Sequence, residues 1–314
     1  MGCAQQRGAE GMIHAMNIPP RGSRWWRCMA IGLPYAWLVL FFFVPFLLVF
    51  KISLADPIVG QPPFTSLFSS GGTSLLNITW DNYRFLFDDD LYLVSYLKSL
   101  QIAFISTLLC LALGYPLAYA IARARPPWRN VLLLLIILPF WTSFLLRVYA
   151  WMGVLGDHGL INNLLMWLGI IERPLKILYT DLAVYLGILY SYLPYMVLPL
   201  YASLERLDPD LHEAAADLGA APLSVFRDIT LPLSLPGIIA GSLLVFIPAI
   251  GEFVIPSLLG GLDSLMIGRT LYDEFFSNRD WPLSAAVATV LLLILVLPIM
   301  VFQHYQARDQ AGVQ

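Results

Sequence analysis

Long apolar stretches constrain this chain more than any other feature of its sequence. They run over about 30–52, 95–122, 131–154, 180–204, 236–258 and 283–304. Each is close to the ~20 residues that an α-helix needs to cross a bilayer. Soluble domains average about a quarter charged residues, whereas this chain is 59% hydrophobic and 12% charged. The sequence therefore predicts an all-α membrane protein with six transmembrane helices and no large soluble domain.

Prolines lie inside three of these stretches: Pro139 in the third, Pro194 and Pro199 in the fourth, and Pro248 and Pro256 in the fifth. A proline removes a backbone donor, and within a membrane this is tolerated only where neighbouring groups satisfy the freed carbonyl. We therefore expect kinked helices that pack in a bundle.

The distribution of basic residues predicts that both termini lie in the cytoplasm, because cytoplasmic loops carry the excess of Lys and Arg. This orientation places ten of them inside, namely Arg7, Arg21, Arg24, Arg27, Arg123, Arg125, Arg129, Arg206, Arg227 and Arg308. It places five outside, namely Arg84, Arg173, Lys176, Arg269 and Arg279. Residues 1–29 and 305–314 are then cytoplasmic tails, and 30–304 form a transmembrane domain.

Motifs of several enzyme and binding classes are missing from the sequence. There is no phosphate-binding G-x-x-x-x-G-K-[ST], no H-E-x-x-H and no G-x-S-x-G. Histidines and cysteines are scattered without metal-ligand spacing, and His212 fits a surface residue better than a ligand. No basic run with interleaved aromatics suggests nucleic-acid binding. We expect no catalytic residue, metal or cofactor in this chain, so its energy must come from elsewhere.

A polar, patterned segment, Asp208 to Pro232, separates the fourth and fifth apolar stretches. Asp208 can cap a helix that has Pro209 in its first turn, and Gly219 can end that helix in a left-handed conformation. A second short helix is predicted from Pro222 through Ile229, ended by Leu231-Pro232. An apolar face of mostly small residues follows the helical repeat: Leu211, Ala214, Ala215 and Leu218. We expect two short helices lying across a membrane surface.

Glu213-Ala214-Ala215, Gly219 and Ile229-x-Leu231-Pro232 resemble the EAA loop of bacterial ABC-importer permeases. The resemblance implies a type I ABC-importer permease fold, in which this loop is the cytoplasmic coupling element and docks into a groove of a separate ATPase. It also implies that Glu213 positions the coupling helix, that Gly219 supplies the tight turn, and that transport proceeds by alternating access.

Two charges lie inside apolar stretches, where burying a charge is expensive. Arg147 is in the third stretch and Glu252 is at a similar fractional depth in the fifth. Both stretches run in the same direction, so the two charges could meet in the outer half of the bilayer. Either they form a structural pair, or Glu252 faces a cationic solute on the translocation path. Gly251, beside Glu252 and between two prolines, could open that helix locally.

Aromatic residues are further candidates for the path, because Tyr and Trp faces attract ammonium groups by cation–π contact. The candidates are Tyr192 and Tyr195 of the fourth stretch and Trp141 of the third. The alternative is that they are packing or interface residues.

Most of the chain, from about residue 31 to 302, resembles the putrescine permeases of the spermidine/putrescine transporter family, including LPFWTSFLLRVYAWMGVLG and FIPAIGEFVIPSLLGGLDSLMIGR. The resemblance implies a multi-pass inner-membrane importer subunit for polyamines, with putrescine first. It also implies an ATPase homodimer that holds ATP and Mg, a second and different permease, and a periplasmic polyamine-binding protein. The alternatives are a permease for an iron chelate, thiamine or an inorganic anion, or a passive channel. An ionised Glu252 would repel an anion.

Overall fold

The computed structural model describes residues 24–65, 78–261 and 264–311. Every regular element within these ranges is a helix, and one isolated bridge joins Pro57 to Phe64. The predicted all-α class is confirmed. The chain divides into two compact units, Met1–Lys51 and Ile52–Gln314, which are described separately. Most of the predicted N-terminal tail, residues 1–23, lies outside the described residues.

The described part of the first unit is one long apolar helix, which ends two residues into the second unit and is built from α2 (Arg24–Leu38), the π-turn η1 (Val39–Phe43) and α3 (Val44–Ser53). Its candidate membrane span is Cys28–Ser53, in agreement with the predicted stretch 30–52. The π-turn has a local cause. Pro45 lacks an N–H, so the ladder shifts by one residue, and the Val44 N–H donates to the Val39 carbonyl.

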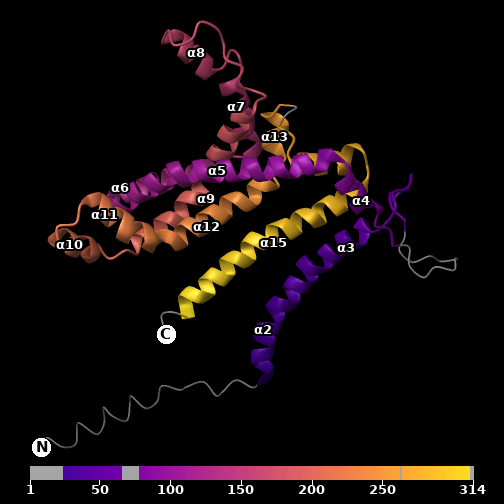
Figure 1. Cartoon of the computed structure of the whole chain (residues 1–314), viewed down its shortest axis with the longest axis horizontal. Coiled ribbons are helices and arrows are strands. Elements are labelled where there is room, and N and C mark those ends of the chain that lie inside the picture. Colours follow the sequence, from indigo (N-terminus) through magenta and orange to yellow (C-terminus); the bar gives the residue numbers. More distant parts are fainter. Residues whose placement is uncertain (1–23, 66–77, 262–263, 312–314) are drawn as a thin grey trace, which may run out of the picture. The chain divides into compact units, whose positions relative to one another are not determined.

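The second unit is organised around three helices that pack against one another: α5 (Asp90–Arg123), α9 (Asp181–Glu205) and α12 (Leu231–Ile250). Figure 1 shows the three as neighbouring ribbons. They approach closely because glycines of one helix face side chains of the next. A Cβ on Gly114 of α5 would lie 2.9 Å from Met196 Cγ, and one on Gly237 of α12 would lie 2.6 Å from Ser203 Cβ.

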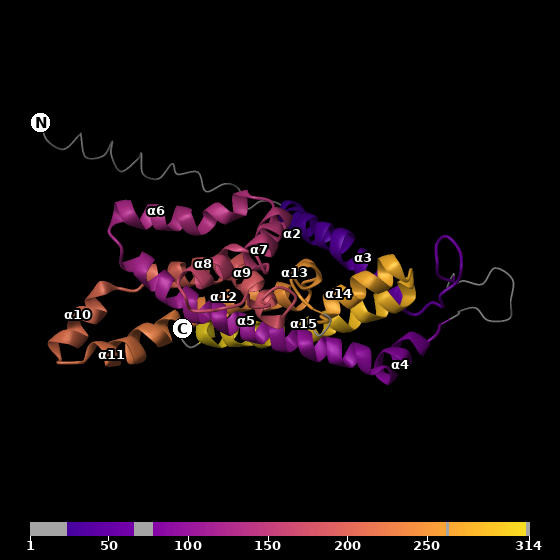
Figure 2. The same ribbon diagram turned by 90° about the horizontal axis from the view of Figure 1, so that it is seen from above.

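The other elements of this unit pack around that core or extend from its ends (Figure 2). Tyr96 of α5 donates 2.7 Å to the Val287 carbonyl of α15, and Lys98 pairs with Asp181 at 2.6 Å. The remaining bounds are α4 (Asp81–Asp88), α6 (Pro126–Ile137), η2 (Leu138–Trp141), α7 (Phe144–Leu155), α8 (Leu160–Trp167), α10 (Pro209–Asp217), α11 (Pro222–Val225), η3 (Phe226–Thr230), α13 (Val254–Leu258), α14 (Ile267–Tyr272), η4 (Asp273–Ser277) and α15 (Trp281–Ala311).

The predicted third stretch, 131–154, is not one helix. Instead, Pro126–Trp141 and Phe144–Trp167 meet at an angle of 95°. Pro139 tightens the end of the first half into the 3₁₀ turn η2, and Thr142 and Ser143 are then extended, with ψ of 151° and 136°. With this pair counted as one span, the described residues hold six candidate spans; without it they hold five.

The predicted stop at Leu231-Pro232 is also wrong. α11 passes through the π-turn η3 directly into α12, so that Pro222–Ile250 forms one continuous helix. Pro232 cannot donate to the carbonyl four residues earlier. The chain widens at this point, and the Leu231 N–H donates to the Phe226 carbonyl five residues back. Proline therefore shapes this helix without ending it.

Candidate functional site

The fifth apolar stretch is broken where the sequence predicts an opening. α12 ends at Ile250, Gly251 to Phe253 are not helical, and α13 begins at Val254. α14 crosses close to this break: a Cβ on Gly268 would lie 2.4 Å from the Gly251 carbonyl oxygen. The break exposes backbone polar groups within an otherwise apolar stretch and places Glu252 at its centre.

Glu252 is buried, with 7% of its surface exposed, and both of its carboxylate oxygens have donors. Oε2 accepts a short hydrogen bond from the Tyr192 hydroxyl on α9. Oε1 accepts from the backbone N–H of Val254 at 3.0 Å and from that of Ile255 at a longer 3.4 Å. A buried charge is costly unless hydrogen bonds satisfy it. These three donors therefore explain how the carboxylate is held in an apolar region.

Arg147, on α7, does not form the ion pair with Glu252 that the sequence allows; no ion pair in the described chain includes it. Its guanidinium lies over the rings of Phe140 and Phe144, with Cζ 5.8 and 5.5 Å from their centroids. Its Nε and Nη1 are buried and have no hydrogen-bond partner in the described chain. The aromatic faces are thus the contacts that stabilise this charge.

The candidate aromatic residues are brought together only in part. The rings of Tyr192 and Tyr195 are 5.8 Å apart, and Phe140 packs against Tyr195 at 5.0 Å. Trp141, by contrast, is 75% exposed and makes no ring contact within the described residues. Sequence reasoning missed Phe140. Its position next to Pro139, at the break in the third stretch, was the available signal.

The segment 208–232 begins and ends its first helix as predicted. The Asp208 carboxylate accepts from the Asp210 N–H at 3.1 Å, and Pro209 opens α10. Gly219 has φ +78°, which glycine adopts without strain. Two backbone bonds close the helix end: Ala220 N–H to Ala215 carbonyl at 3.0 Å, and Gly219 N–H to Ala216 carbonyl at 2.9 Å. This pair of bonds is the Schellman motif.

The two short helices present apolar side chains to the outside and are anchored on their other side. Leu218 is 89% exposed and Leu223 is 76% exposed. On the inner side, His212 Nε2 lies 3.0 Å from the Thr230 hydroxyl, which joins α10 to η3. Phe226 packs edge-on against Tyr115 of α5 at 5.6 Å. His212 therefore links α10 to η3, whereas the sequence suggested a surface residue.

Comparisons with known proteins agree with this architecture. Residues 111–310 match the family described as binding-protein-dependent transport system inner membrane component. The chain is 43% identical, over 85% of its length and 92% of the relative's, to the spermidine/putrescine transport system permease protein PotB of Escherichia coli K12. Its identity to the Haemophilus influenzae protein of the same name is 38%, over 89% of this chain and 93% of that protein.

A crystal structure of a bacterial ABC transporter that imports alginate shares the fold, with a TM-score of 0.68 at 17% identity over 91% of this chain and 96% of that one. The broken span, the buried carboxylate and the projecting helix pair thus occur in a chain whose sequence matches transport permeases along most of its length. The chain belongs to the family of binding-protein-dependent transport system inner membrane components, and it is a multi-pass permease subunit of a bacterial inner-membrane ABC importer.

Proposed function

We propose that this chain is a permease subunit of a polyamine importer, with putrescine as the first candidate substrate. The observation that carries the proposal is its 38–43% identity, over most of its length, to permeases named for spermidine and putrescine. The buried carboxylate of Glu252 supports it, because a polyamine carries ammonium groups that a carboxylate can bind. The same carboxylate disfavours an inorganic anion, and the 38–43% identity favours a polyamine over an iron chelate or thiamine.

The proposed solute path runs past the break between α12 and α13. Glu252 is the carboxylate that recognises the cation, and Tyr192 and Tyr195 offer ring faces and hydroxyls. In this conformation the Tyr192 hydroxyl occupies the oxygen that an ammonium group would bind. Separation of α9 from the break would free that oxygen. Trp141 remains a candidate only for a conformation in which η2 turns towards the path.

Arg147 serves the path indirectly in this proposal. A free cationic guanidinium beside Glu252 would repel a polyamine. The stacking of Arg147 on Phe140 and Phe144 keeps it in a place where ring faces balance part of its charge. Its role is then structural, at the 95° bend between the halves of the third span.

The proposed coupling element is the helix pair α10–α11, docked into a groove on an ATPase. Glu213 and Ala214 are exposed and Ala215 is half-buried, so a partner can cover these side chains of α10. Gly219 sets the angle between the two helices. Ile229, Leu231 and Pro232 lie where η3 enters α12. Because α12 is one continuous helix up to the break, a displacement of the loop reaches Glu252 through a single rigid element.

The remaining parts of the proposal follow from this assignment. Residues 30–304 form the transmembrane domain, both termini lie in the cytoplasm, and the 208–232 loop faces the ATPase there. ATP and Mg belong to an ATPase homodimer. A second, different permease completes the translocation path, and a periplasmic polyamine-binding protein delivers the solute. This chain itself is a transport subunit and not an enzyme.

The experiment that tests the proposal is ATP-dependent uptake of radiolabelled putrescine into vesicles that carry this chain with the products of its neighbouring transporter genes. Spermidine serves as competitor. Uptake that requires both ATP and the binding protein supports the proposal, and the competition ranks the amines. An assembled complex that hydrolyses ATP without taking up either amine would overturn the substrate assignment. Uptake without ATP would instead indicate a passive channel.

A further inference from the structure

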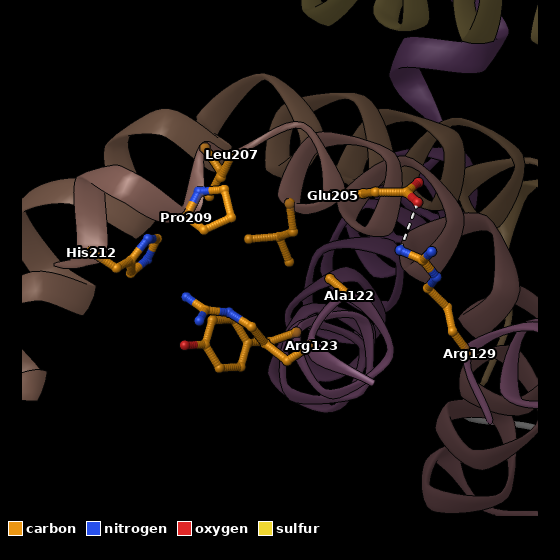
Figure 3. Close-up of a pocket in the computed structure, with 9 residues that line it drawn as sticks. Ala122, Arg123, Arg129, Glu205, Leu207, Pro209 and His212 are labelled. Atoms are coloured by element: carbon orange, nitrogen blue, oxygen red, sulfur yellow. Dashed lines mark hydrogen bonds and ion pairs between the residues drawn. The ribbon is translucent and has the colours of Figure 1, made fainter. Parts of the chain in front are cut away.

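A second polar site lies away from Glu252, at the end of the bundle from which α10 and α11 project. It is a pocket of about 230 Å³ between the ends of α5, α6, α9 and α10 (Figure 3). Its polar lining comes from Tyr119, Arg123, Arg129, Glu205 and His212. None of these residues belongs to the solute path proposed above.

The charges around this pocket do not cancel. Arg129 Nη1 lies 3.0 Å from Glu205 Oε1, so these two neutralise each other, as the dashed line in Figure 3 shows. Arg123 has no ion pair in the part of the chain that the structure describes. Its guanidinium is held over the Tyr119 ring, with Cζ 5.2 Å from the centroid. The Lys, Arg, Asp and Glu side chains that line the pocket therefore carry one net positive charge.

His212 adds an unused polar atom to the same pocket. Its Nε2 lies 3.0 Å from the Thr230 hydroxyl, whereas its Nδ1 is buried and has no hydrogen-bond partner in the described chain. If Thr230 donates to Nε2, the ring proton is on Nδ1, which becomes a donor without an acceptor. Figure 3 shows the Arg123 guanidinium extending towards the His212 ring. In this tautomer His212 Nδ1 and the Arg123 guanidinium are two donors without an acceptor of their own among the residues that line the pocket, since Glu205 is paired with Arg129.

The depth of the pocket indicates what the acceptor is. α5 is a helix of 34 residues. A helix of that length spans about 51 Å, whereas the hydrocarbon core of a bilayer is only about 30 Å thick. At least one end of α5 therefore extends beyond the hydrocarbon core, and Arg123 is its last residue. In the proposed orientation Arg123 is on the cytoplasmic side, where basic pockets between helices bind anionic headgroups.

Trp128 supports the same depth. It lies in the first turn of α6, beside the pocket, and is 66% exposed. Tryptophan is enriched where a membrane protein meets the headgroup region. The end of the bundle that holds the pocket therefore has the composition of a membrane–water interface.

We propose that this pocket binds the phosphate group of an anionic phospholipid, with Arg123 and His212 Nδ1 as its donors. The inference goes beyond the proposed function and takes only its orientation from it. A phosphate bound here would contact α10 and the end of α5 at once. Because His212 also holds Thr230, an occupied site would fix α10 against η3 and the start of α12.

The test uses the full chain, purified and delipidated in detergent, and then titrated with phosphatidylglycerol while bound lipid is counted by native mass spectrometry. We expect Arg123→Gln and His212→Phe each to weaken retention of this lipid by about tenfold. Arg123→Lys should retain most of it. Arg125→Gln is the matched control, because Arg125 carries the same charge two residues further along the chain and does not line the pocket. Thr230→Val removes the hydroxyl that places the ring proton on Nδ1, so it should also weaken retention.

Three results would overturn the assignment. Equal lipid retention by the unaltered chain and by a monodisperse Arg123→Gln variant would show that the pocket does not hold the headgroup. Displacement of the lipid by inorganic phosphate at equal concentration would make the source a free anion. If Arg123→Gln retains the lipid but no longer co-purifies with the ATPase, the group that binds in the pocket is a carboxylate of the ATPase. The lipid titration contains no solute, so its result does not depend on polyamine uptake. The uptake experiment, in turn, does not depend on lipid binding in this pocket.

Discussion

The Tyr192 hydroxyl donates a hydrogen bond to the Glu252 carboxylate, and this bond ties α9 to the break between α12 and α13. Its partners lie on different helices and are separated by 60 positions in the sequence. The Tyr192 hydroxyl can therefore move away from the carboxylate together with α9, whereas the bonds from Val254 and Ile255 come from the backbone next to Glu252. A conformational change that separates α9 from the break exposes one carboxylate oxygen and leaves the other in place.

The two partners of this bond should respond differently to substitution. Glu252→Gln keeps the shape but removes the negative charge that binds an ammonium group, so we expect putrescine uptake to fall roughly tenfold or more. Tyr192→Phe keeps the ring face and removes only the hydroxyl. We expect it to retain uptake and to lose about 0.5–2 kcal/mol of stability. Uptake in vesicles and thermal unfolding in detergent are the two measurements.

Complex assembly is the control for both variants, because a misassembled importer would also lose uptake. Co-purification of the ATPase should be unchanged for Glu252→Gln and for Tyr192→Phe. Normal uptake by Glu252→Gln would remove this residue from the path and give it a purely structural role.

Gly219 should be required for its backbone conformation and not for lack of space. Its φ is +78°, and a Cβ built there would meet nothing within 4 Å. A β-branched residue strains this conformation by about 1–3 kcal/mol, whereas Asn tolerates it. We expect Gly219→Val to uncouple ATP hydrolysis from transport and Gly219→Asn to behave like the unaltered chain. Binding-protein-stimulated ATPase activity in vesicles is the measurement; full stimulation in the Val variant would count against the coupling role.

Local rules predicted local structure well in this chain. The cap at Asp208 and the left-handed Gly219 each depend on a few neighbouring residues, so the sequence alone was sufficient for both. The same holds for the break at Gly251, where glycine and nearby prolines weaken the helix. Apolar length was enough to locate the five candidate spans of the described residues, because the bilayer imposes a minimum length on each.

Features that depend on packing between distant helices were not predictable. Pro139 indicated a kink, but the 95° bend also needs the extended Thr142 and Ser143, to which no local rule assigns that conformation. Pro232 suggested a stop, yet a π-turn carries the helix through it. Equal fractional depth suggested that Arg147 meets Glu252, but depth does not say which face of a helix a residue occupies. Tyr192 lies on the face that reaches the carboxylate.

A substitution of Arg147 tests whether its buried guanidinium stabilises the protein. Its Nε and Nη1 are buried without partners in the described chain, and an unsatisfied buried donor costs about 1–3 kcal/mol. We therefore expect Arg147→Met, which keeps an apolar stem on Phe140 and Phe144, to leave thermal stability unchanged or to raise it. Thermal unfolding of the purified chain in detergent is the measurement. Clear destabilisation would instead show that the contacts of the guanidinium with the Phe140 and Phe144 rings outweigh the cost of its unpaired donors.

Asp280 should give the stability of the second unit a pH dependence opposite to that of a salt-bridged carboxylate. Burial raises the pKa of Asp280, its hydrogen bond from the Leu283 N–H at 3.0 Å lowers it, and nearby Glu274 raises it, with a net upward shift. The folded protein therefore holds this proton more tightly than the unfolded chain does. Stability from this group is present at low pH and is lost as the pH rises through the raised pKa.

The substitution that isolates this effect is Asp280→Asn, because Asn caps a helix as well as Asp and carries no charge. We expect Asp280→Asn to be at least as stable as the unaltered chain at about pH 8, where the ionised carboxylate is half-buried near Glu274. Its advantage should shrink as the pH is lowered and Asp280 gains its proton. Asp280→Ala should lose about 0.5–2 kcal/mol at high and at low pH, since it removes the cap. Thermal unfolding of the three proteins over a series of pH values decides the matter: a constant difference between the Asp and Asn forms would mean that Asp280 keeps its ordinary pKa in the folded protein.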